Sequence, residues 1–114
     1  MESGGTMRIV NVNEGRYADF RLDGRYLTIG GNLTIDLAQE QRGYDVTLDV
    51  CSDSDGKLAV GQGIRYVCQI FIPGRVYAIH ETGDADEMGF RQIEKTAQSL
   101  DTDKVVLYLW SMEE

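Results

Sequence analysis

The tetrapeptide Asp-Ser-Asp-Gly at residues 53–56 comes nearest to a ligand pattern in this sequence. Carboxylates gathered around a turn that glycine makes possible are what Ca²⁺ prefers. An EF-hand loop with Gly56 in its sixth position would place Gln62 in the twelfth, where a bidentate glutamate is needed. The spacing therefore excludes an EF-hand. A looser calcium site on Asp53 and Asp55 is kept as the weaker alternative to a solvated turn.

A zinc site or a cysteine–histidine pair is the second chemistry to weigh. His80 is the only histidine, so zinc would need both cysteines and a carboxylate. The predicted strand register sets Cys51 beside Val67 and Val67 beside His80, which separates Cys51 from His80 by about 10 Å across two strand spacings. Cys68 faces the other side, which also disfavours a disulfide. We therefore predict reduced core thiols, and no metal, cofactor or catalytic residue.

Aromatic residues of the later strands are the remaining candidates for a functional surface. Tyrosine and tryptophan combine a large apolar ring with a polar group, which suits protein interfaces. Ordinary cross-strand packing explains the same residues equally well. The interface candidates are Tyr66, Phe71, Tyr77, Tyr108 and Trp110.

Composition narrows the class of partner. The chain has 114 residues, enough for one domain, with residues 1–6 expected to be a flexible leader. Nineteen acidic against eleven basic residues give a net charge of -8, which disfavours a nucleic-acid partner. There is no apolar run of about 20 residues and no export signal. We expect a soluble cytoplasmic protein with no membrane partner.

A β-meander at residues 16–38 is the best-defined element. The Asp-Gly pair at residues 23–24 favours a two-residue type I′ hairpin turn, which sets Phe20 opposite Leu27. A three-residue Gly-Gly-Asn loop at residues 30–32 then sets Ile29 opposite Leu33. A one-residue slip would send the third strand's apolar set to the wrong face. The predicted apolar face comprises Ala18, Phe20, Leu22, Leu27, Ile29, Leu33, Ile35 and Leu37.

Two pairings compete for the strand at residues 45–50. The favoured one sets Val50 opposite Cys68 in a strand at residues 64–72, with residues 52–63 as a projecting loop. The alternative is a hairpin at Asp55-Gly56 that folds residues 57–60 back on the same strand. A type II turn at Pro73-Gly74 is then predicted to pair residues 64–72 with residues 75–81.

The C-terminal third of the chain is predicted to contain one short helix and one central strand. Phe90, Ile93, Ala97 and Leu100 have helical spacing, which predicts a short helix at residues 88–100, with an extended segment as the alternative. An acidic loop is expected at residues 82–87. Residues 104–110 are apolar on both faces, which is typical of a central strand.

These patterns predict a mainly β fold: an antiparallel sandwich or small barrel of about seven strands with one short helix. As a function we predict a non-catalytic binding or assembly module. It would associate with itself, or with another protein, through the doubly apolar strands at residues 64–81 or 104–110. The alternative is a small-molecule carrier with a ligand inside a barrel, followed by a small hydrolytic or metal-dependent enzyme.

Overall fold

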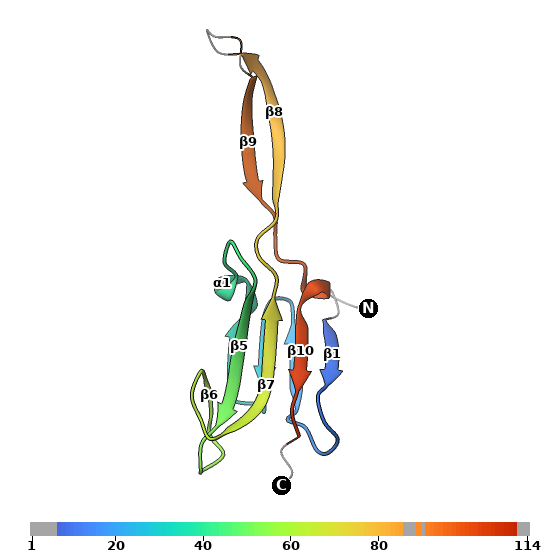
Figure 1. The fold of residues 1–114 in the computed structure, drawn as a ribbon, viewed down its shortest axis with the longest axis vertical. Helices are drawn as coiled ribbons and strands as arrows, with labels where there is room; N and C mark the ends of the chain where they lie inside the picture. The colour runs from blue at the N-terminus through green and yellow to red at the C-terminus, as the bar shows by residue number, and fades with distance from the viewer. Residues whose placement is uncertain (1–6, 86–88, 90, 112–114) are drawn as a thin grey trace.

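The computed structural model describes residues 7–85, 89 and 91–111, and its described part is mainly β (Figure 1). The described strands form one sheet of five strands, one of three and one of two. In chain order the elements are β1 (Arg8–Asn11), β2 (Phe20–Asp23), β3 (Tyr26–Ile29), β4 (Leu33–Asp36), α1 (Leu37–Glu40), β5 (Val46–Ser52), β6 (Leu58–Val60), β7 (Arg65–Ile72), β8 (Tyr77–Ala85), β9 (Arg91–Ala97), the 3₁₀ turn η1 (Thr102–Lys104) and β10 (Val106–Leu109).

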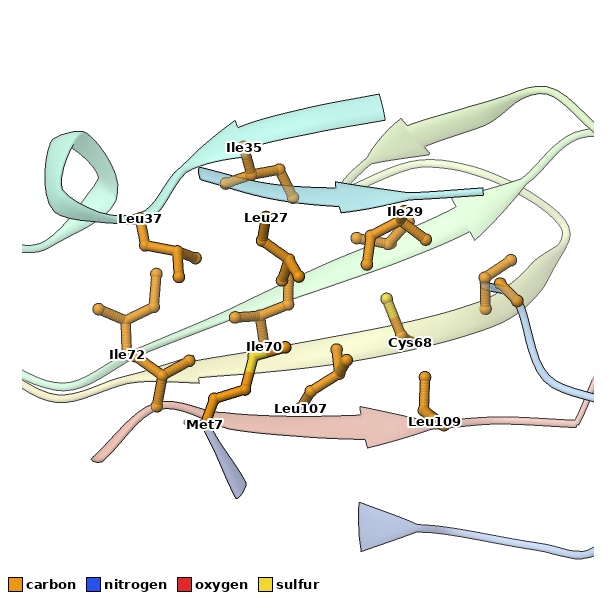
Figure 2. Packing of buried hydrophobic residues seen from close by; sticks show 14 residues of the cluster. Met7, Leu27, Ile29, Ile35, Leu37, Cys68, Ile70, Ile72, Leu107 and Leu109 are labelled. Atoms are coloured by element: carbon orange, nitrogen blue, oxygen red, sulfur yellow. The ribbon is translucent and has the colours of Figure 1, made fainter. Parts of the chain in front are cut away.

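The two larger sheets pack face to face as a sandwich. The five-stranded sheet has the order β1-β10-β7-β5-β6, and the meander β2-β3-β4 lies against it. Figure 2 shows Leu27 and Ile29 of the meander pointing toward Ile70 and Leu107 of the larger sheet. The described strands do not close into a barrel, so the sandwich prediction is confirmed and the barrel alternative is wrong.

At the first meander turn, the pairing register of β2 with β3 is shifted by two residues from the prediction. Leu22 pairs with Leu27 and Phe20 with Ile29, so the loop consists of Gly24 and Arg25. Gly24 has φ +62° and Arg25 does not have a positive φ, which matches a type II′ turn. This register pairs two leucines, whereas the predicted one set Leu22 against a charged arginine. Because side chains alternate with a period of two, the predicted faces survive the shift.

The second meander turn has the predicted register. Ile29 pairs with Leu33 and Leu27 with Ile35 around the three-residue loop. On the predicted apolar face, Leu27, Ile29 and Leu37 are fully buried, whereas Phe20, on the edge strand β2, is 40% exposed.

The single short helix of the described chain follows this meander directly. Asp36 caps α1, since its Oδ1 accepts a hydrogen bond from the Gln39 amide at 3.2 Å. Its Oδ2 lies 2.5 Å from Nη2 of Arg25, and this hydrogen bond lowers the pKa of the Asp36 carboxyl. Asp36 thus caps the helix and, through Arg25, holds the end of the meander against its first turn.

Strand β5 uses both of the pairings that we had treated as alternatives. Val50 lies opposite Cys68 of β7, as predicted, and opposite Val60 of β6 on its other edge. The hairpin and the long-range pairing are compatible because a strand has two edges. A bulge after Val50 shifts the ladder so that Cys51 pairs with Tyr66, and the predicted pairing of Cys51 with Val67 is wrong.

The predicted hairpin at Pro73-Gly74 is absent from the described structure. Gly74 does not have the positive φ that a type II turn needs at this position. The chain instead runs past residues 42–45: the Gly74 amide donates to Oδ1 of Asp45 at 2.8 Å, and the Arg75 amide donates to the Arg42 carbonyl at 2.8 Å. A Cβ on Gly74 would lie 2.9 Å from Cα of Tyr44, so only glycine allows this close approach.

Strands β8 and β9 form a separate antiparallel ribbon, which corrects two predictions. Residues 91–97 are a strand where a helix was predicted at 88–100, and β8 extends through Ala85 into the predicted acidic loop. Phe90, Met88 and residues 86–87 lie outside the described residues. Cross-strand pairing overrides the helical spacing, and the β-branched Ile93 and Thr96 favour a strand.

Strand β10 is central, as predicted, between β7 and β1. Its pairing with β1 is parallel, so the large sheet is mixed rather than purely antiparallel. Val105, Leu107 and Leu109 are buried in the core, and the alternate side chains are half-buried on the opposite face.

The ribbon makes the molecule elongated. It projects from one end of the sandwich (Figure 1), and the chain measures 67 × 34 × 23 Å. The radius of gyration is 18.8 Å, whereas a compact domain of this length has one of about 13 Å. The fold therefore consists of a sandwich body and the projecting ribbon of residues 77–97.

Candidate self-association surface

The ribbon begins where two backbone segments leave the body together. The Gln98 amide donates to the Val76 carbonyl at 2.8 Å, and the ladder continues with Tyr77 opposite Ala97 and Ile79 opposite Lys95. Neither strand belongs to either sheet of the body. The ribbon is thus a two-stranded sheet that pairs only with itself among the described strands.

Apolar side chains of the ribbon lie in water. Val76 at its base is 58% exposed, Tyr77 is 45% exposed and Ile79 is 61% exposed. Large apolar side chains are normally covered when they are grouped, and an exposed group marks an interaction site. An isolated two-stranded hairpin is also marginally stable in water. Tyr77 and Ile79 share one face of the ribbon and Val76 lies on the other, so both faces carry uncovered apolar side chains.

The outer edges of the ribbon point backbone groups away from the molecule. The bond from Gln98 to Val76 fixes the ladder alternation, so Ala78 and Thr96 bond to each other across the ribbon. The amides and carbonyls of the residues between them therefore point outward. These outward residues include Tyr77 and Ile79 on β8 and Lys95 and Ala97 on β9.

Four of the five predicted interface residues lie elsewhere, on the outer face of the five-stranded sheet. Tyr66 and Trp110 stack there with ring centroids 5.4 Å apart, and Trp110 donates from Nε1 to Oε1 of Gln69 at 3.1 Å. Phe71 and Tyr108 share this face, because they alternate with buried core residues along β7 and β10. Only Tyr77 belongs to the ribbon.

The polar network under Trp110 continues to Asp49. Gln69 accepts from Trp110 and donates from Nε2 to Oδ1 of Asp49 at 2.9 Å. Gln69, Trp110 and Asp49 are half-buried. Trp110 thus already has a stacking partner and a hydrogen-bond partner within the chain. The outer face is therefore a weaker candidate for a contact surface than the ribbon.

The calcium candidates Asp53 and Asp55 form the turn between β5 and β6. Oδ1 of Asp53 accepts hydrogen bonds from the amides of Asp55 and Lys57, both at 2.9 Å. This carboxylate therefore stabilises the turn itself. Among the described residues, no group of three or more His, Cys, Asp or Glu is placed to hold a metal ion.

The two cysteines are free and buried in the body. Burial raises the pKa of both thiols, that of Cys68 to about 12, so little thiolate exists at neutral pH. His80 lies in β8 of the ribbon, with its backbone opposite Glu94, and not beside Val67. The predicted arrangement of Cys51, Val67 and His80 on neighbouring strands is therefore wrong.

Shallow hollows lie on the surface of the described part of the chain. One hollow of about 390 Å³ lies between the turn at residues 53–56 and the start of β7. Ser52, Arg65 and Tyr66 are among the residues that line it. Its acidic residue is Asp53, whose carboxylate already binds the turn, so the hollow does not bring free acid–base groups together.

Comparisons with protein-family models, with curated proteins and with solved structures found no match. In the described part of the chain, no helix has the length and apolar content needed to cross a bilayer.

Sequence reasoning predicted a strand at residues 75–81 and kept an extended segment as the alternative at residues 88–100, but it missed the pairing of the two as a ribbon. The local signal was weak, since residues 91–97 show no alternation of apolar and polar residues and contain only two β-branched residues, Ile93 and Thr96. Gly89, with φ +84°, lies in the connection between the strands, where glycine suits a turn. The apolar residues at helical spacing outweighed this signal.

Proposed function

We propose that this chain is a non-catalytic assembly module that associates with copies of itself through the ribbon β8–β9. The carrying observation is the set of apolar ribbon side chains that the body leaves uncovered: Val76, Tyr77 and Ile79. The two free thiols suit a reducing compartment, so the location we propose is the cytoplasm.

The estimated free energy of this self-association is weak to moderate. Fully burying a large apolar side chain contributes about 1.5–3 kcal/mol, so a half-exposed one contributes about 1 kcal/mol. Three such side chains from each of two copies contribute about 6 kcal/mol. Net backbone hydrogen bonds add about 1 kcal/mol each, while association costs about 4–15 kcal/mol. We therefore expect an equilibrium that depends on protein concentration.

The carrier alternative loses its main support. It required a barrel with a ligand inside, whereas the space between the two body sheets holds packed side chains such as Leu27, Ile70 and Leu107 (Figure 2). An enzyme required polar side chains that converge in a cleft. Cys51 and His80 belong to different parts of the fold, the body and the ribbon.

Two isoleucines of similar exposure provide a matched test. Ile79 is 61% exposed on the ribbon and Ile64 is 70% exposed on the body. We expect the wild-type mass measured by multi-angle light scattering to rise with concentration. Ile79→Lys should shift this rise to higher concentration, because the lysine ammonium would have to be desolvated in the contact. Ile64→Lys should leave it unchanged.

A wild-type protein that stays monomeric over the whole concentration series would contradict the proposed function. Equal effects of the two substitutions would show that association does not use the ribbon. Circular dichroism spectra of both variants serve as the control for folding, because neither residue is part of the buried core.

A further inference from the structure

The geometry points to a closed dimer in which the ribbons of two copies run in opposite directions, with one body at each end. This inference rests on the proposed self-association and names its occupant: the ribbon of a second copy, joined by strand addition. Two features determine the arrangement, namely the directions of the ribbon strands and the width of the body.

The body occupies one end of the ribbon. Strand β8 leads away from the body and β9 leads back to it (Figure 1). Both connections lie at the same end, because the Gln98 amide bonds to the Val76 carbonyl at 2.8 Å. Along β8 the free edge begins beyond Arg75, whose amide already donates to the Arg42 carbonyl. A strand added to the ribbon therefore has to stop before it reaches the body.

Two ribbons that run in the same direction bring their bodies together. Neighbouring strands lie about 4.8 Å apart, so strand addition sets the axes of two such ribbons about 10 Å apart. The chain is 34 Å wide in the plane in which Figure 1 shows β8 and β9 side by side. The two bodies would occupy the same space. Antiparallel pairing of β8 with β9 of another copy requires this direction, so the body excludes it.

Two ribbons that run in opposite directions keep their bodies apart. Each body then lies beyond the far end of the partner's ribbon, and the length of the ribbon separates the two bodies. Strand β8 has nine residues and spans about 30 Å. Antiparallel pairing in this direction joins like strands, either β8 with β8 of the second copy or β9 with β9.

Outward backbone groups for this pairing exist on both edges. Tyr77 and Ile79 provide them on β8, and Lys95 and Ala97 provide them on β9, since all four lie between the bonded pairs of the ribbon ladder. Either pairing of like strands can therefore form new hydrogen bonds between the two copies.

Pairing of like strands makes the contact two-fold. Both copies use the same surface, and such a contact is complete with two copies, whereas heterologous contacts continue into rings or filaments. The two ribbons form one sheet of four strands. A two-fold axis perpendicular to this sheet places Tyr77 and Ile79 of both copies on one face. A sheet of this size with an apolar face is more stable than an isolated hairpin.

The length of the dimer is the first test. The single chain is 67 Å long, and an overlap of one ribbon length gives a dimer about 100 Å long. Small-angle X-ray scattering on a concentration series of the full chain should show this increase. Over the same series, the mass from light scattering should level off at twice the monomer mass. Ile79→Lys at the same concentration should keep the monomer length.

Energy transfer between two dyes tests the direction of the ribbons. Tyr44→Cys places a dye near the ribbon base, because Tyr44 packs beside Gly74 and is 69% exposed. Ile64→Cys places a dye at the opposite end of the body, where β7 begins, and Ile64 is 70% exposed. The native thiols are buried, so the dyes attach at the introduced position.

Donor-labelled and acceptor-labelled copies of one variant are mixed and concentrated. Opposite ribbons separate the two dyes near the ribbon bases by about 30 Å, so Tyr44→Cys should give efficient transfer. The dyes at Ile64→Cys would lie almost a full dimer length apart and should give little transfer.

Efficient transfer at both positions would overturn the opposite direction of the ribbons while leaving the proposed self-association in place. A mass that keeps rising beyond the dimer would overturn the closed two-fold contact in the same way. A monomer at every concentration would overturn both the dimer and the proposed function.

Discussion

Replacing residues 77–97 by an Asn-Gly turn is expected to give a monomer at every concentration, with the body folded as before. The Gln98 amide already bonds to the Val76 carbonyl at 2.8 Å, which is the hydrogen bond that closes a two-residue hairpin turn. The core cluster contains no residue from the replaced segment. The free energy of unfolding should therefore change by less than about 1 kcal/mol.

Light scattering measures the mass of this variant, and urea titration measures its stability. Fluorescence of Trp110, which stacks on Tyr66 at the outer face of the sheet, reports whether the body is intact. If the shortened protein still self-associates like the wild type, the ribbon is not the contact surface. A large loss of stability would mean that the ribbon supports the body.

Gly63→Ala is expected to destabilise the body strongly. A Cβ at this position would lie 2.4 Å from Cβ of Cys51 and 2.8 Å from the carbonyl oxygen of Ser52. Both are firmly held on β5, and the residue has φ +154°, which other residues rarely adopt. Overpacking and backbone strain each cost about 1–3 kcal/mol. We expect a loss of about 2–6 kcal/mol in the urea-derived free energy of unfolding.

Gly61→Ala is the matched control for this substitution. Gly61 has φ +85° in the same segment, but an added Cβ would meet nothing within 4 Å. Its cost should be the conformational one alone, about 1–2 kcal/mol. Equal losses for the two variants would show that residues 61–63 do not pack against Cys51 as tightly as the structure indicates.

Local sequence patterns predicted most of the body correctly, because alternating apolar and polar residues determine which face of each strand is buried. The Gly-Gly-Asn loop fixed Ile29 opposite Leu33, since any one-residue slip exposes an apolar strand face. The match of Val50 with Cys68 likewise followed from apolar alternation in both strands. The first turn was harder, because Asp-Gly-Arg permits two hairpin turns, and the apolar Leu22–Leu27 contact selects between them.

The region after Ile72 was predicted poorly because its structure depends on contacts distant in sequence. Pro73-Gly74 has the composition of a turn, yet bonds from Gly74 and Arg75 to the segment at residues 42–45 keep it extended. This holds the following strand away from β7. The candidate surface then arises from the ribbon, of which the sequence analysis had indicated residues 75–81 as part of an apolar strand pair and Tyr77 as an interface residue.

Residue-resolved amide exchange by NMR, on samples below and above the association midpoint, tests ribbon self-association most directly. The amides of Ala78, Thr96 and Gln98 point into the ribbon and should exchange slowly at high concentration, whatever the contact. The outward amides of the pairing strand, Tyr77 and Ile79 on β8 or Lys95 and Ala97 on β9, should exchange quickly in the dilute sample and become protected on association. Outward amides that exchange equally fast in both samples, while the mass rises, would contradict strand addition at the ribbon.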